Sequence, residues 1–344
     1  MPLSAAHQQQ INEAMIGATV LITGGAGFIG GHIGHRCIAA GAKVRVLDDL
    51  TGGFAENIAP GAELIRASVL DDVALNKAAS GCAYVFHQAA MVSVPESVAK
   101  SYECMQVNVV GTERVLSAAK AAGVRRVMFA ASAAAYGNNP TLPSSERHLP
   151  DSFSPYAMSK ISGELLCQTF SRCYGLSTVA LRYFNVFGER QNPNSAYAAV
   201  ISAFHKALTA GTTPKIFGDG QQTRDFVYIE NVVNANLLAA TCPKPLTGEI
   251  INIGTGQRVS LLTVLERMAE ALGKPAKPEF HPARAGDIRD SAADISAAAE
   301  LIGYQPVIDF ATGINRMLAC TNPTTSGAAS SAATNQPRHA VLSK

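Results

Sequence analysis

Charge, paired cysteines and long apolar runs are all scarce in this sequence, and each scarcity excludes a class of protein. Charged residues make up only 16% of the 344 residues, and 28 Lys and Arg against 26 Asp and Glu leave a formal net charge of +2. A nucleic-acid polymer is held through a strong basic excess, so we expect no such partner. No window approaches the roughly 18 consecutive apolar residues of a membrane span, so we expect no membrane insertion.

The seven cysteines form no Cys-X-X-Cys pair, which argues against a disulfide framework and against a zinc site. We therefore expect reduced thiols and no bound metal. The N-terminal residues lack a basic segment followed by an apolar one, so we expect no signal peptide. Together these features indicate a cytoplasmic protein.

Apolar residues, by contrast, are plentiful at 47%, and they fall into short runs that alternate with helical patterns. Helical spacing predicts helices at residues 30–42, 96–123 and 154–175, the last with Ser154 as N-cap and Pro155 at its first position. Strands alternating with helices indicate an α/β fold with a doubly wound parallel sheet of the Rossmann type. Buried strands are predicted at residues 18–23, 43–49, 62–67, 83–88, 125–132 and 176–185.

Further along the chain this rhythm loosens, and turn clusters separate shorter elements. We expect residues 191–320 to form mainly a smaller, mixed α/β C-terminal lobe that covers the substrate. Residues 225–241 have the pattern of a helix that can return to the sheet, so the main domain, residues 18–190, should include segments from later sequence. Residues 1–17 are polar and weakly patterned, so we expect a loose leader. Residues 321–344 are rich in Ser, Thr and Ala, so we expect a disordered tail.

A glycine cluster follows the first strand, with Gly24, Gly27 and Gly30 in a GxxGxxG arrangement. Such glycines allow a tight turn, close approach of the backbone to a pyrophosphate, and anion binding at the next helix N-terminus. Asp48 ends the next strand, where a carboxylate can hydrogen-bond both hydroxyls of an adenosine ribose. An acid at this place favours NAD over NADP, and the alternative for Asp48 is a solvated strand end.

Tyr156 and Lys160 lie four residues apart on a predicted helix and therefore share one face. Such a pair also occurs by chance on a solvated helix, but here Ser132 ends the fifth strand, at the edge where open α/β sheets bind ligands. A phenol needs its pKa lowered by about three units, or roughly 4 kcal/mol, to act as a base at pH 7, and a close ammonium favours this. Tyr156 can then remove a hydroxyl proton while Ser132 holds the oxygen.

With these residues in place, the sequence resembles the extended short-chain dehydrogenase/reductase superfamily, and within it the UDP-hexose and UDP-N-acetylglucosamine 4-epimerases. The resemblance implies epimerisation of a UDP-hexose at C4 with NAD, through a transient 4-keto sugar. The implied substrates are UDP-N-acetylglucosamine and UDP-N-acetylgalactosamine, and also UDP-glucose and UDP-galactose. The motifs that carry it are TGGAGFIG (23–30), VLDDL (46–50), HQAAMVSVPES (87–97), NVVGT (108–112), ASAAAYG (131–137), SPYAMSK (154–160), LRYFNVFGERQNP (181–193), AYAAVI (196–201), GDGQQTRDFVYIENV (218–232) and RAGDIRDSAADIS (284–296).

The resemblance assigns a cofactor site residue by residue. Ser68 stands where the family usually has an Asp that meets the adenine, so it offers a hydrogen bond without charge. Catalysis falls to Ser132, Tyr156 and Lys160, and the lysine also binds the nicotinamide ribose. The implied NAD contacts are Gly24, Gly27, Phe28, Ile29, Gly30, Asp48, Asp49, Ser68, Val69, Ala89, Asn108, Tyr156, Lys160 and Phe184.

It likewise assigns a UDP-sugar site, in which Arg224 and Arg284 suit guanidinium clamps on a diphosphate. Ser291 is small where relatives restricted to glucose and galactose carry a bulky Tyr, which leaves room for an acetamido group at C2. Val92 stands where N-acetyl-preferring relatives often carry Gly, which argues against a strict N-acetyl preference. The implied substrate contacts are Val92, Ser132, Asn185, Ala198, Ala199, Val200, Phe217, Arg224, Leu261, Arg284, Asp287 and Ser291.

Three alternatives differ in how well they fit these motifs. In nucleotide-sugar 4,6-dehydratases the Ser or Thr at the end of this strand is followed by Asp-Glu. In this chain Ser132 is followed by Ala133 and Ala134, which can carry no proton. A UDP-glucuronate 4-epimerase or decarboxylase shares most of the frame and stays open. A non-catalytic NAD-binding regulator would lose the Tyr/Lys pair, which this chain retains. The resemblance further implies a homodimer, formed through the helices near residues 98–122 and 155–174.

Overall fold

A seven-stranded parallel sheet forms the centre of the computed structural model, which describes residues 3–192, 199–283 and 288–321. The strand order is β11-β6-β5-β4-β1-β2-β3, and every neighbouring pair is parallel. From β1 the chain winds outward in one direction through β2 and β3, and in the other through β4, β5 and β6. This confirms the predicted doubly wound fold. The strands are β1 (Thr19–Thr23), β2 (Lys43–Leu47), β3 (Glu63–Ile65), β4 (Tyr84–His87), β5 (Arg126–Ser132), β6 (Thr178–Tyr183) and β11 (Thr247–Ile253).

The central strands are buried at nearly every position because helices cover both faces of the sheet. All seven residues of β5 and all six of β6 are buried. The prediction of a buried strand at residues 62–67 is wrong, because β3 is only three residues long and lies at the sheet edge. Glu63 and Leu64 are exposed there.

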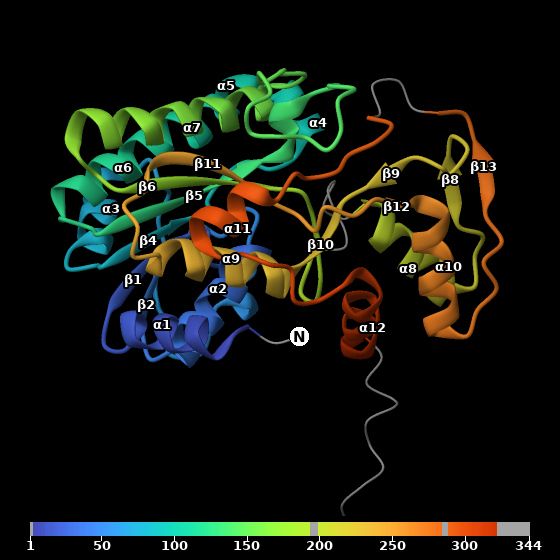
Figure 1. Cartoon of the computed structure of the whole chain (residues 1–344), viewed down its shortest axis with the longest axis horizontal. Coiled ribbons are helices and arrows are strands. Elements are labelled where there is room, and N and C mark those ends of the chain that lie inside the picture. The colour runs from blue at the N-terminus through green and yellow to red at the C-terminus, as the bar shows by residue number, and fades with distance from the viewer. Residues whose placement is uncertain (1–2, 193–198, 284–287, 322–344) are drawn as a thin grey trace, which may run out of the picture.

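One layer of helices lies above the sheet in Figure 1, and a second lies below it. The prediction of a single helix at residues 96–123 is wrong, since the backbone leaves helical geometry at Lys100, with φ −128° and ψ 56°. The upper layer holds α3 (Asp72–Ala79), α4 (Val94–Ala99), α5 (Ser101–Met105), the π-helical turn η2 (Gln106–Val110), α6 (Gly111–Ala121) and α7 (Pro155–Tyr174). The lower layer holds α2 (Phe28–Ala39), α9 (Ile229–Thr241) and α11 (Ser296–Ile302).

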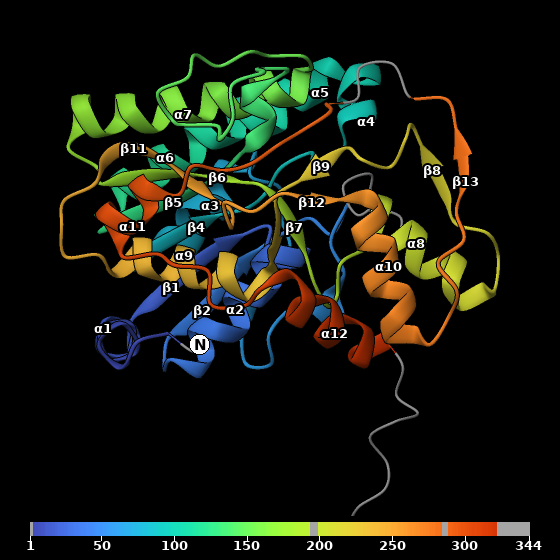
Figure 2. The same cartoon turned by 45° about the vertical axis from the view of Figure 1, so that its right-hand side comes forward.

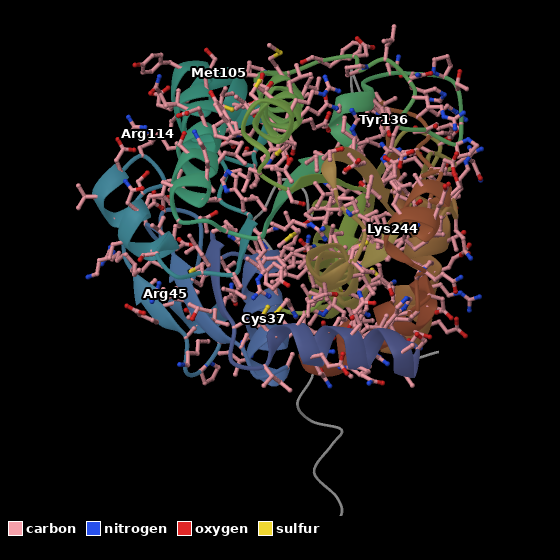
Figure 3. All side chains as sticks on the ribbon, turned by 60° about the vertical axis from the view of Figure 1, so that its left-hand side comes forward. Cys37, Arg45, Met105, Arg114, Tyr136 and Lys244 are labelled. Atoms are coloured by element: carbon pink, nitrogen blue, oxygen red, sulfur yellow. The ribbon has the colours of Figure 1, made fainter. Side chains whose placement is uncertain are left out.

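A further helix, α1 (Ala5–Met15), covers the outer side of α2 and α9, so the prediction of a loose leader is wrong for these residues. Ile11 and Met15 lie one helical turn apart and are fully buried, in the same core cluster as Cys37 of α2. Figure 3 shows α1 along the base of the molecule with Cys37 beside it. Gln10 adds a hydrogen bond from its Nε2 to the carbonyl oxygen of Thr241, at 3.1 Å. Apolar burial at helical spacing and hydrogen bonds to the neighbouring helices together hold this segment in place.

The second unit is a smaller lobe beside the carboxyl ends of the strands (Figure 2). The chain enters it directly from β6, leaves it to form α9 and β11 on the main sheet, and then returns. The remaining tail, residues 322–344, lies outside the described residues. The elements of the lobe are β7 (Asn185–Phe187), α8 (Ala199–Ala210), β8 (Lys215–Phe217), β9 (Thr223–Arg224), β10 (Phe226–Tyr228), β12 (Val259–Ser260), α10 (Leu261–Leu272), β13 (Glu279–His281) and α12 (Phe310–Thr321).

Candidate active site

The glycine loop lies where the winding of the sheet changes direction, between the carboxyl ends of β1 and β4. Open α/β sheets bind ligands in the crevice at this point. Gly24 follows β1 with φ +71°, and a Cβ atom there would lie 2.6 Å from the backbone nitrogen of Ala89, which follows β4. Only glycine fits this turn, both by its conformation and by the closeness of the two loops.

The rest of the loop leads into the N-terminus of α2. Gly27 is the N-cap of this helix and has no side chain to occupy its first N–H groups. A Cβ atom at Gly30 would lie 2.3 Å from the carbonyl oxygen of Gly24, so the helix and the loop pack backbone to backbone. Phe28 and Ile29 form the first turn. The result is a side-chain-free cradle at a helix N-terminus, and this fits the pyrophosphate of a dinucleotide.

Asp48 follows β2 and is buried beside this loop. Its carboxylate accepts hydrogen bonds from the backbone N–H groups of Ala26 and Leu50, each at 2.9 Å. A carboxylate has about four acceptor positions, so two remain for the hydroxyls of a ribose. Asp48 therefore shapes the glycine loop in addition to its predicted contact with the ribose. The sequence alone does not indicate this structural role.

Three further predicted cofactor contacts lie in the loops after β2 and β3. Asp49 accepts hydrogen bonds from the backbone and the hydroxyl of Thr51. Ser68 Oγ accepts from the backbone N–H of Leu70, at 3.2 Å. Val69 is buried against Gly111, where a Cβ atom would lie 2.6 Å from its Cγ2.

Tyr156 and Lys160 lie in the first two turns of α7, whose predicted N-terminus is confirmed. Ser154 Oγ accepts from the backbone N–H of Ala157 at 3.1 Å, and Pro155 opens the helix. Both Tyr156 and Lys160 are buried, and the lysine Nζ lies 5.7 Å from the centre of the tyrosine ring.

The lysine also connects α7 to the strand that ends in Ser132. Its Nζ donates to the carbonyl oxygen of Ala130 on β5, at 2.7 Å. Ser132 is buried two residues further on, and its Oγ accepts from the backbone N–H of Ala134 at 3.1 Å. The three predicted catalytic residues thus lie on β5 and on α7, which packs against it, and Ser132 ends its strand at the same sheet edge as the glycine loop.

Burial makes Lys160 a weaker base than an exposed lysine. Removal from water lowers its pKa from 10.5 to about 8, against the opposing effects of Cys104 and Glu164. At pH 7 the amine is still mainly an ammonium. It can therefore stabilise a tyrosinate at Tyr156 while carrying a cationic charge through the neutral range.

Two other predicted cofactor residues line the same edge. Asn108 is buried, and its amide bonds to the backbone of Met91. Phe184 follows β6, is buried, and packs with its ring centre 6.1 Å from that of Tyr136. Phe184 follows the strand that pairs with β5 next to Ser132, and Asn108 bonds through Ser159 to the backbone of Tyr156.

The described substrate residues gather mainly on the lobe. Phe217 ends β8, with its ring centre 5.4 Å from that of His281. Gln222 links two of the predicted contacts. Its side-chain Nε2 donates to the backbone carbonyl oxygen of Phe217, and its backbone carbonyl oxygen accepts from the N–H of Leu261. Val200 packs in the lobe core on α8. Phe217, Gln222 and Leu261 thus form one hydrogen-bonded wall of the lobe.

A second part of this wall surrounds β9. Arg224 donates from Nη1 to the carbonyl oxygens of Thr223 and Arg289, at 2.9 and 3.0 Å. The backbone N–H of Ser291 donates to Thr223 as well, and the serine hydroxyl is buried with no hydrogen-bond partner in the described part of the chain. Val92 lies on the sheet side and is 47% exposed. The predicted contacts Ala198, Arg284 and Asp287, and the side chain of Ala199, lie outside the described residues.

Asp225, directly after Arg224, is a buried residue of the site that the sequence alone does not indicate. It is fully buried, and its carboxylate accepts from Thr255, Gly256 and the backbone of Ala293, over distances of 2.7–3.0 Å. Its own carbonyl accepts from Asn185 Nδ2 at 3.3 Å. Asp225 thereby joins the β9 wall to the loop after β11. Its position directly after Arg224 was the available signal, but the partners are distant in sequence.

A buried ion pair beneath α7, the helix of the predicted catalytic pair, was also missed. Arg182, on β6, donates from Nε and Nη2 to the two carboxylate oxygens of Glu164 on α7, each at 2.7 Å. The guanidinium also lies over the ring of Tyr136, 4.6 Å from its centre. Both charged side chains are at least 98% buried. The pair holds α7, and with it Tyr156 and Lys160, against the sheet.

Comparison with known proteins agrees with this geometry. Residues 20–254 match the model of the family described as the NAD dependent epimerase/dehydratase family, which is more than half of the chain. The UDP-glucose 4-epimerase of Mycolicibacterium smegmatis is 40% identical over 301 residues, covering 86% of this chain and 95% of that protein. The chain therefore belongs to this family, and the family confirms both the resemblance and the predicted cofactor.

Solved structures show the same relationship. The UDP-N-acetylglucosamine 4-epimerase of Methanobrevibacter ruminantium M1, in complex with UDP-N-acetylmuramic acid, matches with a TM-score of 0.84 and 37% identity, over 88% of this chain and 97% of that chain. The UDP-glucose 4-epimerase of Thermus thermophilus, in complex with NAD, matches with a TM-score of 0.79 and 34% identity, over 87% and 97%.

Two kinds of feature are absent from the described residues. None of the helices in the described ranges is long and apolar enough to cross a membrane. Within the same ranges, His, Cys, Asp and Glu side chains nowhere gather in threes as a metal ion would require.

Proposed function

We propose that the protein is a UDP-sugar 4-epimerase that uses NAD and returns it unchanged at the end of each turnover. The observation that carries this proposal is the pairing of Tyr156 and Lys160 beside Ser132, followed by two alanines instead of the acid pair of a dehydratase. Groups are thus present to move the proton of one hydroxyl group. No acid follows Ser132 to move a second proton at a neighbouring carbon.

The mechanism assigns one task to each of the three residues. Lys160 keeps its positive charge in a dry site and thereby favours the phenolate of Tyr156, which accepts the proton of the sugar 4-hydroxyl. Ser132 holds the same oxygen. NAD, held by the glycine loop and Asp48, would supply the acceptor and later the donor for the hydride at C4. The resulting 4-keto sugar turns about its diphosphate linkage, and Tyr156 returns the proton as C4 is reduced on the other face.

The lobe holds the part of the substrate that does not react. Phe217 and Leu261 offer apolar contact to the base, and Arg224 offers positive charge to the diphosphate. Because the sugar must turn while the nucleotide stays fixed, the two halves of the substrate belong to different units of the fold. This division agrees with the position of the catalytic residues on β5 and α7 and of the residues around β9 on the lobe.

Ser291 supports a substrate range that includes 2-acetamido sugars. Its side chain is small, and its buried hydroxyl is available for a further hydrogen bond. We expect Ser291→Tyr to abolish turnover of UDP-N-acetylglucosamine while UDP-glucose is still epimerised, because a ring at this place removes the volume for the acetamido group. Equal loss of both activities would contradict this role.

The deciding experiment is to incubate the purified protein separately with UDP-N-acetylglucosamine, UDP-glucose and UDP-glucuronate and to resolve the products by proton NMR. We expect the first two to give their C4 epimers without added reductant. Conversion of UDP-glucuronate alone, or release of carbon dioxide from it, would replace the proposal with the uronate alternative.

The proposal also includes a homodimer in the cytoplasm. Val98, Tyr102, Met158 and Leu165 are large apolar side chains that are about half exposed or more on neighbouring helices α4, α5 and α7. Light scattering of the wild type and of Leu165→Glu tests whether this face pairs two copies. The cysteines in the described ranges are all free thiols, which is consistent with a reducing compartment.

A further inference from the structure

His87, the last residue of β4, lies fully buried at the centre of the sheet edge and bonds through both ring nitrogens. Its Nδ1 is 2.7 Å from the hydroxyl of Thr23, at the end of β1, and its Nε2 is 2.9 Å from the hydroxyl of Thr112, on α6. The ring thus links the strand that leads into the glycine loop to the helix layer above the sheet.

The directions of these hydrogen bonds follow from the neighbours of the two threonines. Thr112 donates its proton to the carbonyl oxygen of Asn108 at 2.6 Å, so towards the imidazole it can only accept. His87 must therefore carry its proton on Nε2, and Nδ1 accepts from Thr23. Thr23 in turn receives the backbone N–H of Ala89 at 3.4 Å.

The π-helical turn is the next part of the chain of bonds. The N–H of Gly111 bonds to the carbonyl of Gln106, five residues earlier, rather than to the usual position four residues earlier. Such turns are often found at functional sites. Here the turn carries Asn108, whose carbonyl oxygen receives the hydroxyl of Thr112.

The side chain of Asn108 continues the path to the catalytic helix. Its Nδ2 donates to the carbonyl of Met91 at 3.0 Å and to Ser159 Oγ at 2.9 Å, and its Oδ1 accepts from the N–H of Met91 at 2.7 Å. Ser159 then donates to the carbonyl oxygen of Tyr156, at 2.8 Å. Both amide protons of Asn108 are used within the chain.

We infer that His87 is a positioning residue for the reaction: the chain of bonds from Thr23 through His87, Thr112, Asn108 and Ser159 fixes the glycine loop and the Tyr156 turn relative to one another. The inference rests on the proposed epimerase function, because the two segments hold the two reaction partners. It gives Asn108 a task within the protein, beside the cofactor contact that the sequence suggests.

A fixed protonation state suits this task. Burial, with the charge of nearby Lys160, lowers the pKa of His87 to about 3. The ring therefore stays neutral across the working range, and the bond directions stay as described. A path through neutral groups also adds no second positive charge next to the ammonium.

Thr112→Val tests the inference, because it removes the hydroxyl while nearly keeping the shape, and Thr112→Ser restores the hydroxyl. We expect Thr112→Val to lower kcat about 10- to 100-fold, as a slight misplacement of reacting groups does, with KM for the UDP-sugar within about twofold of the wild type. Thr112→Ser should recover most of the loss. Hydrogen exchange at the Met91 amide should become faster in the valine variant only.

Thr169→Val is the matched control, since Thr169 also donates to a helical carbonyl four residues earlier, but on the exposed side of α7. A wild-type kcat in Thr112→Val, or an equal loss in Thr112→Ser, would overturn the inference. If Thr112→Val does not fold, Thr23→Val and Thr23→Ser carry the same comparison. Hydrogen exchange at the Met91 amide does not depend on turnover. It therefore tests the chain of hydrogen bonds even if the proposed epimerase function is wrong.

Discussion

Replacing Lys160 with methionine should make the folded protein more stable while ending catalysis. The pKa of this lysine falls from 10.5 to about 8 on burial, so the folded state holds its proton less tightly than the unfolded chain does. A shift of this size corresponds to about 3 kcal/mol of destabilisation below pH 8. The Ala130 carbonyl loses its hydrogen bond in the variant, which costs about 1 kcal/mol, so the net gain at pH 7 is about 2 kcal/mol.

Urea unfolding of the cofactor-free wild type and of Lys160→Met, between pH 6 and pH 10.5, measures this difference. The unfolded lysine binds more protons than the folded one between pH 8 and pH 10.5, so the wild type becomes more stable relative to the variant as the pH rises through this range. Lys77→Met, an exposed lysine on α3, is the control and should show no such pH dependence. A variant no more stable than the wild type at pH 7 would refute the reasoning.

Three further outcomes follow from the site. Tyr156→Phe should lower kcat by about 10²- to 10⁴-fold, as the loss of an acid–base group does, and near-normal conversion by NMR would contradict the proton transfer. Gly30→Ala should lose bound NAD, because the new Cβ would lie 2.3 Å from the carbonyl oxygen of Gly24. Gly52→Ala, whose Cβ would have no atom within 4 Å, should retain NAD. The amount of nucleotide released on denaturation measures both variants. Arg182→Met should lower the free energy of unfolding by about 3–5 kcal/mol through the unpaired Glu164, and the double variant Arg182→Met, Glu164→Met should regain much of this in urea titrations.

Features formed by neighbours in sequence were predictable. The glycine loop follows from the GxxGxxG spacing, and the start of α7 follows from Ser154 and Pro155. Asp48 was placed correctly at the end of a strand. Its contact with the N–H of Ala26 was not, because that bond depends on how β1 and β2 pair.

Features formed between distant segments were not predictable. Asp225 bonds to residues about 30 and 68 positions later, and nothing local to it shows these partners. Arg182 lies inside a run that is otherwise apolar, and only the position of Glu164 on the facing helix explains a charge there. The break at Lys100 changes the backbone angles of a single residue, and the helical spacing of apolar residues on either side does not show it.

The lobe is not a continuous stretch of chain, and this has a consequence during synthesis on the ribosome. Its first elements, β7 to β10, come before α9 and β11 in the chain. Its other elements, among them α10 and α12, come after β11. A nascent chain that ends before residue 247 therefore has β6 as an unpaired outer strand of the sheet. Unpaired strand edges can pair with other chains, so the edge of β6 is exposed to such pairing until β11 emerges.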